Sequence, residues 1–278
     1  MKIRKFNKNN TSILLQNKLD IFQNPIVRNT SKPFSGDILP TVNKLELFAN
    51  NIQDLVTSEF EKLAQTKTQN SLILSISSEY GLGKTSFIDR WGSRLINEDN
   101  IALKFDAWKF DHSDQPAISF FYTMNEQLSL YKNQETKDQI NKIIKLAPAI
   151  ITVIEISAAI SHPWAIPFIS SFRKAVKKYQ KKTADNKVNL NKFVKSLSSL
   201  ASKSKNKTIY FFIDELDRCN PIFAIKLMEI IKHIFHASGV VFVLTLNQKA
   251  LEATIRKIYG LNCEQSSEYL ERFFDFQL

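Results

Sequence analysis

The residues with the clearest chemical potential lie in the run Ser78-Glu79-Tyr80-Gly81-Leu82-Gly83-Lys84-Thr85. This run follows the spacing of a phosphate-binding loop, G-x-x-x-x-G-K-[ST], with Ser78 in place of the first glycine. The glycines let backbone N–H groups turn toward phosphate oxygens, while Lys84 would reach the β- and γ-phosphates and Thr85 would offer its hydroxyl to Mg²⁺. The helix expected to start here, with Ser86 in its first turn, directs its positive end at the same anion. The run predicts a nucleotide-binding loop for ATP with Mg²⁺; the alternative is a glycine-rich turn in which Gly-Lys-Thr occurs by chance.

A second motif, Ile209–Cys219 (IYFFIDELDRC), joins an apolar run to acidic residues. Asp214 stands where a strand would end, as in a Walker B element, and would hold Mg²⁺ through water. Glu215 beside it would polarise the attacking water. Taken alone, the two acids could instead stabilise the positive end of the next helix. The phosphate-binding loop upstream favours the metal-binding and water-activating roles.

Short apolar runs alternate with amphipathic segments along the chain. We expect helices at 43–66, after Lys84, at 116–131, 221–236 and 248–259 and near 264–272, and strands at 71–77, 101–108, 208–213, 240–246 and 273–278. Short runs that are apolar throughout are typical of strands buried on both faces. Strands that alternate with helices indicate a parallel sheet covered by helices on both faces. The expected fold class is therefore α/β.

Composition excludes several classes of protein. Of the 278 residues, 44% are hydrophobic and 21 are Phe, so much of the chain needs burial and general disorder is excluded. The two cysteines, Cys219 and Cys263, offer neither a disulfide scaffold nor metal-ligand spacing. The charged amino-terminal residues lack the apolar run of a signal peptide, so we expect a cytoplasmic protein. The net charge of +11 gathers in residues 173–207, which hold 12 basic residues and one acid.

Four blocks of the sequence together resemble the KAP family of P-loop NTPases. They are Tyr80 before Gly-x-Gly-Lys-Thr, where the family usually has Trp, and the runs 105–110 (FDAWKF), 213–219 (IDELDRC) and 269–274 (YLERFF). These runs are similar to the family's F-N-A-W-R/K-Y, I-D-D-L-D-R-C and Y-L-E-K-I-F. The resemblance covers roughly residues 36–278, and residues 132–207 match it in placement only.

The resemblance implies a three-layer core of the ASCE type, in which an extra strand lies between the two strands that carry the motifs. The interval between Lys84 and Asp214 has room for that strand and for a helical insertion. We therefore divide the chain into a polar, loosely ordered lead-in (1–35), a first part of the NTPase domain (36–131), an apolar and then basic insertion (132–207) and a second part of the domain (208–278). Related ATPases continue into a helical lid at this point, so we expect the lid to be absent.

Further site residues follow from the same resemblance. Asn247 occupies the position of a sensor for the γ-phosphate, where the family commonly has Asp; capping the next helix is an equally good role for it. Arg272 stands where related ATPases place an arginine finger that completes a neighbour's site. Arg218 is another candidate cation, and either arginine could instead form a structural ion pair. Asp106 and Trp108 are expected to be structural, packing the second strand near the nucleotide.

The resemblance implies a signalling-type ATPase of the STAND kind, which acts as a regulatory switch. Without the helical lid, the core would bind nucleotide weakly and hydrolyse it slowly when alone. Several prokaryotic members of the family act in defence against phage, and many carry transmembrane segments between the two motifs. Here the apolar stretch 147–172 is too short for two spans and contains Glu155 and two prolines. We expect a helical hairpin that is buried or faces a partner. The alternative is contact with the inner face of the cell membrane through residues 147–182, whose lysines suit anionic headgroups.

Two other function classes stay open. A nucleic-acid-dependent ATPase would use the basic segment to track a backbone, although that segment offers only Tyr179 and Phe193 for stacking. A nucleotide-binding scaffold, or a truncated core, would have little turnover, and the intact set of Lys84, Thr85, Asp214 and Glu215 argues against it. For an ATPase the expected partners are a second copy of the chain or an effector protein.

Overall fold

The chain forms a parallel β-sheet. The computed structural model describes Lys18, Phe22 and residues 40–66, 71–113, 115–161, 183–204 and 206–278. In this part of the chain five strands follow the order β2-β3-β4-β1-β5, and every neighbouring pair is parallel. The strands are β1 (Leu72–Ser77), β2 (Ile101–Asp106), β3 (Ile209–Asp214), β4 (Val240–Leu246) and β5 (Phe276–Gln277). The expected α/β fold with a parallel sheet is confirmed.

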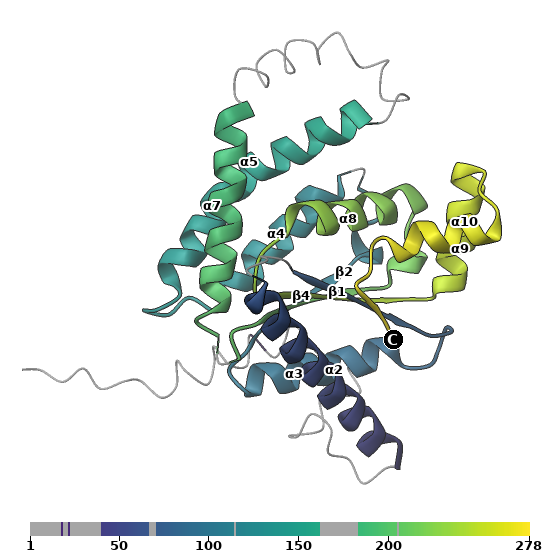
Figure 1. Ribbon diagram of the computed structural model, residues 1–278, viewed down its shortest axis with the longest axis horizontal. Helices are drawn as coiled ribbons and strands as arrows, with labels where there is room; N and C mark the ends of the chain where they lie inside the picture. The colour runs from purple at the N-terminus through teal and green to yellow at the C-terminus, as the bar shows by residue number, and fades with distance from the viewer. Residues whose placement is uncertain are drawn as a thin grey trace, which may run out of the picture.

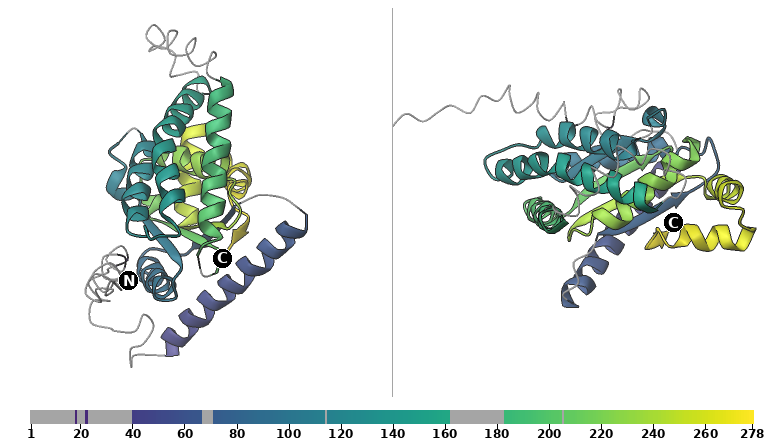
Figure 2. Two further views of the ribbon diagram at one scale, coloured as in Figure 1. Left: turned by 90° about the vertical axis from the view of Figure 1, so that its left-hand side faces the viewer. Right: turned by 90° about the horizontal axis from the view of Figure 1, so that it is seen from above.

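Helices cover both faces of the sheet, which makes the molecule three-layered. One face carries α2 (Pro40–Gln65) and α3 (Lys84–Asn97), and the other carries α4 (Pro116–Ser129), α5 (Lys137–Ser161), α7 (Thr183–Ala201) and α8 (Pro221–Ile234) (Figures 1 and 2). The last helices, α9 (Gln248–Tyr259) and α10 (Cys263–Glu271), pack against each other. Alternate residues of each strand point to opposite faces. Phe212 of β3 therefore joins the apolar cluster of α3, whereas Phe211 joins that of α4 and α8.

The order of the strands corrects one expectation. The strand between β1 and β3 is β4, which pairs with both of them. We expected this extra strand within the interval between Lys84 and Asp214, but that interval contains β2, which lies at the edge of the sheet beside β3. The carboxyl ends of β1, β4 and β3 consequently stand next to one another. This edge of an open α/β sheet is where ligands bind.

Two strands are shorter than expected, each for a local reason. β2 ends at Asp106 because that carboxylate accepts a hydrogen bond from the Lys109 N–H at 3.1 Å, which starts the 3₁₀ turn Trp108–Phe110. β5 begins only at Phe276, because the backbone N–H groups of Phe273 and Phe274 still bond to carbonyls of α10 at 2.9 and 3.3 Å. Ala107, Phe273 and Phe274 are buried as their apolar side chains indicated, but they lie in turns rather than in strands.

Residues 132–207 contribute α5 and α7, which lie side by side (Figure 1). Buried residues of both helices belong to the same apolar cluster as α4 and the sheet; they are Ile140, Ile143, Ala147, Ile150, Phe193, Leu197 and Leu200. Residues 162–182, which include Pro163, Pro167 and the first part of the basic segment, lie outside the described residues. Among the helices that the structure describes, none is both long and apolar enough to cross a bilayer.

Phe22 is one of two residues of the expected lead-in, 1–35, that the structure describes. Its ring is fully buried, and it meets the ring of Phe212 edge to face at a centroid distance of 5.4 Å. The ring sits directly against Gly92 of α3, which has no side chain to exclude it. Apart from Phe22 and Lys18, the lead-in lies outside the described residues.

Candidate nucleotide-binding site

The predicted phosphate-binding loop connects β1 to α3, as expected. Gly81 and Gly83 have φ values of 79° and 83°, a left-handed conformation that other residues rarely adopt. A Cβ atom added at either position would have no neighbour within 4 Å, so the two glycines are needed here for their backbone conformation rather than for space. Gly83 is also the residue immediately before α3, and the first N–H groups of a helix lack partners within the helix. The loop therefore presents backbone donors and a positive helix end to the same region.

Ser78 and Glu79 hold the Lys84 side chain through their backbone carbonyl groups. Ser78 is not among the described residues with a positive φ, so the departure from the motif's first glycine causes no backbone strain. The carbonyl oxygens of Ser78 and Glu79 accept hydrogen bonds from the Lys84 ammonium group at 2.6 and 3.0 Å. These two residues do not line the pocket, and their predicted role in binding nucleotide stays a prediction.

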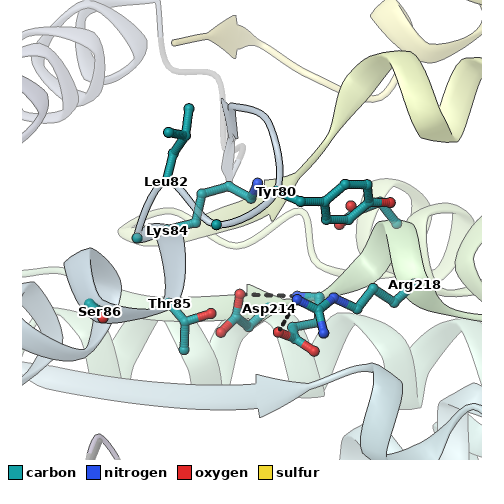
Figure 3. Close-up of a pocket in the computed structure, with 11 residues that line it drawn as sticks. Tyr80, Leu82, Lys84, Thr85, Ser86, Asp214 and Arg218 are labelled. Carbon is teal, nitrogen blue, oxygen red and sulfur yellow. Dashed lines mark hydrogen bonds and ion pairs between the residues drawn. The ribbon is translucent and has the colours of Figure 1, made fainter. Parts of the chain in front are cut away.

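The two sequence motifs meet in one pocket (Figure 3). From the loop and α3 it is lined by residues 80–86, and from the end of β3 and the turn after it by Asp214, Glu215, Asp217 and Arg218. Figure 3 shows the Thr85 hydroxyl directed toward the Asp214 carboxylate, whereas Leu82 points away and is 70% exposed. Residues far apart in the sequence thus form one site, because β4 holds their strands at a fixed separation.

Asp214 is buried and rigidly held. Its Oδ1 accepts hydrogen bonds from the Glu215 backbone N–H at 3.0 Å and from the Thr245 hydroxyl of β4. Its Oδ2 faces the Lys104 ammonium group at 3.5 Å. A carboxylate and a hydroxyl are oxygen donors of the kind that Mg²⁺ prefers, and Asp214 and Thr85 both line the pocket. The residues present therefore fit the magnesium site that the motifs predict.

Glu215, the predicted water-activating residue, has a strained backbone. Its φ is 57° in the left-handed region, a conformation that costs roughly 1–3 kcal/mol for a residue with a side chain. Its carboxylate forms an ion pair with Arg218 at 3.3 Å. Burial raises the pKa of Glu215, and the nearby Arg218 guanidinium opposes that shift. A raised pKa brings a carboxylate closer to the range in which it serves as a general base.

Arg218 packs between two aromatic side chains at the rim of the pocket. Its guanidinium carbon lies 5.8 Å from the ring centroid of Tyr80 and 5.3 Å from that of Trp108, distances typical of cation–π contacts. We expected Trp108 to pack the second strand, and this is wrong, because its side chain is 50% exposed. Its partner is instead the exposed guanidinium, while the Asp106 carboxylate accepts a hydrogen bond from the Lys109 N–H within the turn that carries Trp108.

A buried ion pair beside Asp214 was missed in the sequence. Lys104 of β2 contacts Asp89 of α3 at 2.6 Å, and burial raises the pKa of Asp89 to about 6 although Lys104 opposes the shift. Both residues carried a signal that could have been used. Lys104 is a charged residue inside a short apolar strand, and Asp89 lies on the apolar side of its helix next to Ile88. The same signal marks Thr245, a hydroxyl within the apolar run of β4.

Like Ser78 and Glu79, the predicted residues Asn247 and Arg272 lie outside the pocket lining. The Asn247 side chain accepts a hydrogen bond from the Ala250 N–H at 3.2 Å and caps α9, which is one of the two roles expected for it; the sensor role stays a prediction. Arg272 is exposed at the end of α10. Its role as an arginine finger also stays a prediction.

Comparison with known proteins agrees with this geometry. A family model described as "KAP family P-loop domain" matches residues 46–278, which include both motifs and all five strands. A search of curated proteins found no match to the chain.

Proposed function

The chain belongs to the KAP family of P-loop domains, and is thus a nucleotide-binding NTPase, and we propose that it binds ATP with Mg²⁺ and hydrolyses the β–γ phosphoanhydride bond. The observation that carries this proposal is the convergence of Lys84, Thr85, Asp214 and Glu215 on one pocket. A chance glycine-rich turn or an acidic helix start would account for either motif alone. Neither accounts for their meeting across a third strand.

Each of these residues has a distinct task in the proposed reaction. The loop N–H groups and the Lys84 ammonium group bind the β- and γ-phosphates, for which Lys84 exchanges its two carbonyl partners for phosphate oxygens. Thr85 and Asp214 would hold the metal, which would neutralise charge that develops on the phosphates. Glu215 orients the attacking water and accepts its proton, and the raised pKa caused by burial suits that role.

Nucleotide binding is tested by thermal melting. Mg-ATP at about 100 times its dissociation constant should add roughly 2.7 kcal/mol of stability, and each kcal/mol raises the melting temperature by about 2–4 °C at this size. Lys84→Ala should abolish the shift, whereas Lys142→Ala, which removes an exposed lysine on α5, should retain it. Mg-GTP in parallel reports the base preference. The absence of any shift with either nucleotide, or an equal shift in Lys84→Ala, would contradict the proposal.

Hydrolysis is tested by Glu215→Gln. This variant should bind Mg-ATP as the parent does, because Asp214 is untouched, while phosphate release falls by about 10²–10⁴-fold. Asp214→Asn should instead weaken the dependence of binding on Mg²⁺. A parent that binds ATP without measurable turnover would identify a nucleotide-binding scaffold. Turnover of Glu215→Gln at the parent rate would move the water-activating role to Asp217, which also lines the pocket.

We further propose that the chain acts as a regulatory switch that assembles with a second copy. The support is that Arg272 is exposed and lies outside its own pocket, as a residue that completes a neighbour's site would. An arginine supplied by a neighbour can raise the rate of phosphoryl transfer by about 10³–10⁵.

A further inference from the structure

Three charged side chains meet under the phosphate-binding loop, on the α3 side of the sheet. They are Asp89 from α3, Lys104 from β2 and Asp214 from β3. The side chains of Asp89 and Asp214 are each 3% exposed, and that of Lys104 is 14% exposed. Only Asp214 lines the pocket. Neither Asp89 nor Lys104 is used in the proposed chemistry, yet burying charges in this way is costly unless they are paired.

The single ammonium group is shared unequally between the two carboxylates. Lys104 Nζ donates a hydrogen bond to Asp89 Oδ1 at 2.6 Å, whereas its distance to Asp214 Oδ2 is 3.5 Å. The second distance is longer than a normal N–H···O hydrogen bond. Asp89 is held in place by its helix, whose neighbouring Ile88 and Trp91 are fully buried. The cation is therefore drawn toward Asp89 and away from the predicted metal ligand.

The position of the Lys104 ammonium group matters because it faces Oδ2 of Asp214, not Oδ1. Oδ1 already accepts hydrogen bonds from the Glu215 N–H and the Thr245 hydroxyl. Oδ2 is thus the oxygen left for the metal or for its bound water. An ammonium group that paired fully with Oδ2 would place a positive charge where Mg²⁺ must act.

We propose that Asp89 is a positioning residue for the metal site: by holding Lys104 on its own carboxylate, it keeps Lys104 from neutralising Asp214. The inference rests on the proposed function, and it names a determinant of metal affinity at the same site. Asp89 itself does not line the pocket. Its effect passes through Lys104, so replacing Asp89 should matter only while the lysine is present.

The substitution Asp89→Asn removes the restraining charge and keeps the size of the side chain and its acceptor oxygen. Lys104 then has Asp214 as its remaining charged contact among the described residues. Loss of a residue that orients a metal ligand typically weakens metal binding 10–100-fold. We expect Asp89→Asn to raise, by about the same factor, the Mg²⁺ concentration that gives half of the maximal shift in melting temperature. Adding Lys104→Met removes the competing charge and should return the midpoint to near the parent value.

The experiment measures melting of the full chain at a fixed, saturating ATP concentration while Mg²⁺ is varied. The variants are Asp89→Asn, Lys104→Met and the double variant. Glu98→Gln, which removes one negative charge at the far end of α3, is the matched control and should leave the Mg²⁺ midpoint unchanged. Melting without ligand shows that each variant is folded.

The outcomes separate the two proposals. If the parent shows no shift with Mg-ATP, the proposed function fails and the inference fails with it. If the parent responds and Asp89→Asn has the parent's Mg²⁺ midpoint, the proposed function stands and the inference is overturned. A double variant as impaired as Asp89→Asn would also overturn it, because Asp89 would then act without Lys104. Should Asp89→Asn not fold, the double variant decides, since only a midpoint near that of the parent supports the inference.

Discussion

The burial of Phe22 against Gly92 leads to a prediction that a double-mutant cycle tests. A Cβ atom added at Gly92 would lie within 2.6 Å of three carbon atoms of the Phe22 ring. That separation is far below van der Waals contact, and neither partner can yield easily. Gly92 is inside α3, and the Phe22 ring is fully buried against Phe212 and the rest of its cluster. Gly92→Ala must therefore displace the ring.

The magnitude follows from what the ring loses. Removing a buried Phe side chain costs about 3–5 kcal/mol, and expelling the ring from its site should cost a similar amount. Replacing glycine with alanine within a helix stabilises the folded chain by about 1 kcal/mol. Gly92→Ala alone should thus destabilise the chain by about 2–4 kcal/mol. In a Phe22→Ala background no ring is left to displace, so the same substitution should stabilise the chain by up to about 1 kcal/mol.

Urea denaturation followed by circular dichroism measures all four members of the cycle. The coupling energy between the two sites should be about 3–5 kcal/mol, well above the roughly 0.5 kcal/mol seen for independent sites. Ser93→Ala, one position along the same helix, controls for the general effect of alanine in α3. If Gly92→Ala has the same effect with and without Phe22, the ring does not pack where the structure places it.

Three further predictions concern titration, reactivity and assembly. Burial raises the pKa of Asp89 to about 6. Between about pH 4 and 6 the folded chain therefore binds a proton that the unfolded chain has lost. The free energy of unfolding consequently falls as the pH rises through this window. Relative to the parent, Asp89→Asn should gain up to about 3 kcal/mol in urea unfolding between pH 4 and 7, and a constant difference would contradict this. Burial raises the pKa of Cys219 to about 12, whereas Cys263 is exposed. A thiol reagent should therefore label only Cys263 in the native chain and both cysteines in urea. Rapid labelling of both cysteines in the native chain would refute this prediction. If Arg272 acts on a neighbour, mixing Arg272→Ala with Lys84→Ala should restore part of the turnover that each lacks, and a mixture without activity would show that it does not.

The elements and the two motifs were readable from the sequence because they depend on neighbours along the chain. β4 and α9 were predicted with the bounds that they have, 240–246 and 248–259. An apolar run flanked by polar residues indicates a buried strand whatever it pairs with, and Asn247 can cap a helix with its own side chain. The left-handed glycines of the phosphate-binding loop are likewise a local requirement. The ends of β2 and β5 were predicted less well, because buried residues there do not have strand conformation.

What the sequence determined by itself is therefore the kind of site: a phosphate-binding loop, a metal-binding aspartate and an acidic residue beside it, on an α/β sheet. The tertiary structure alone decided which strands are neighbours, that Phe22 fills the space over Gly92, and that Lys104 stands between Asp89 and Asp214. Each of these is a contact between residues distant in the chain. Periodicity shows that a side chain is buried, and a charge within an apolar run shows that it needs a partner. Neither identifies the partner, because that depends on how separate elements pack together.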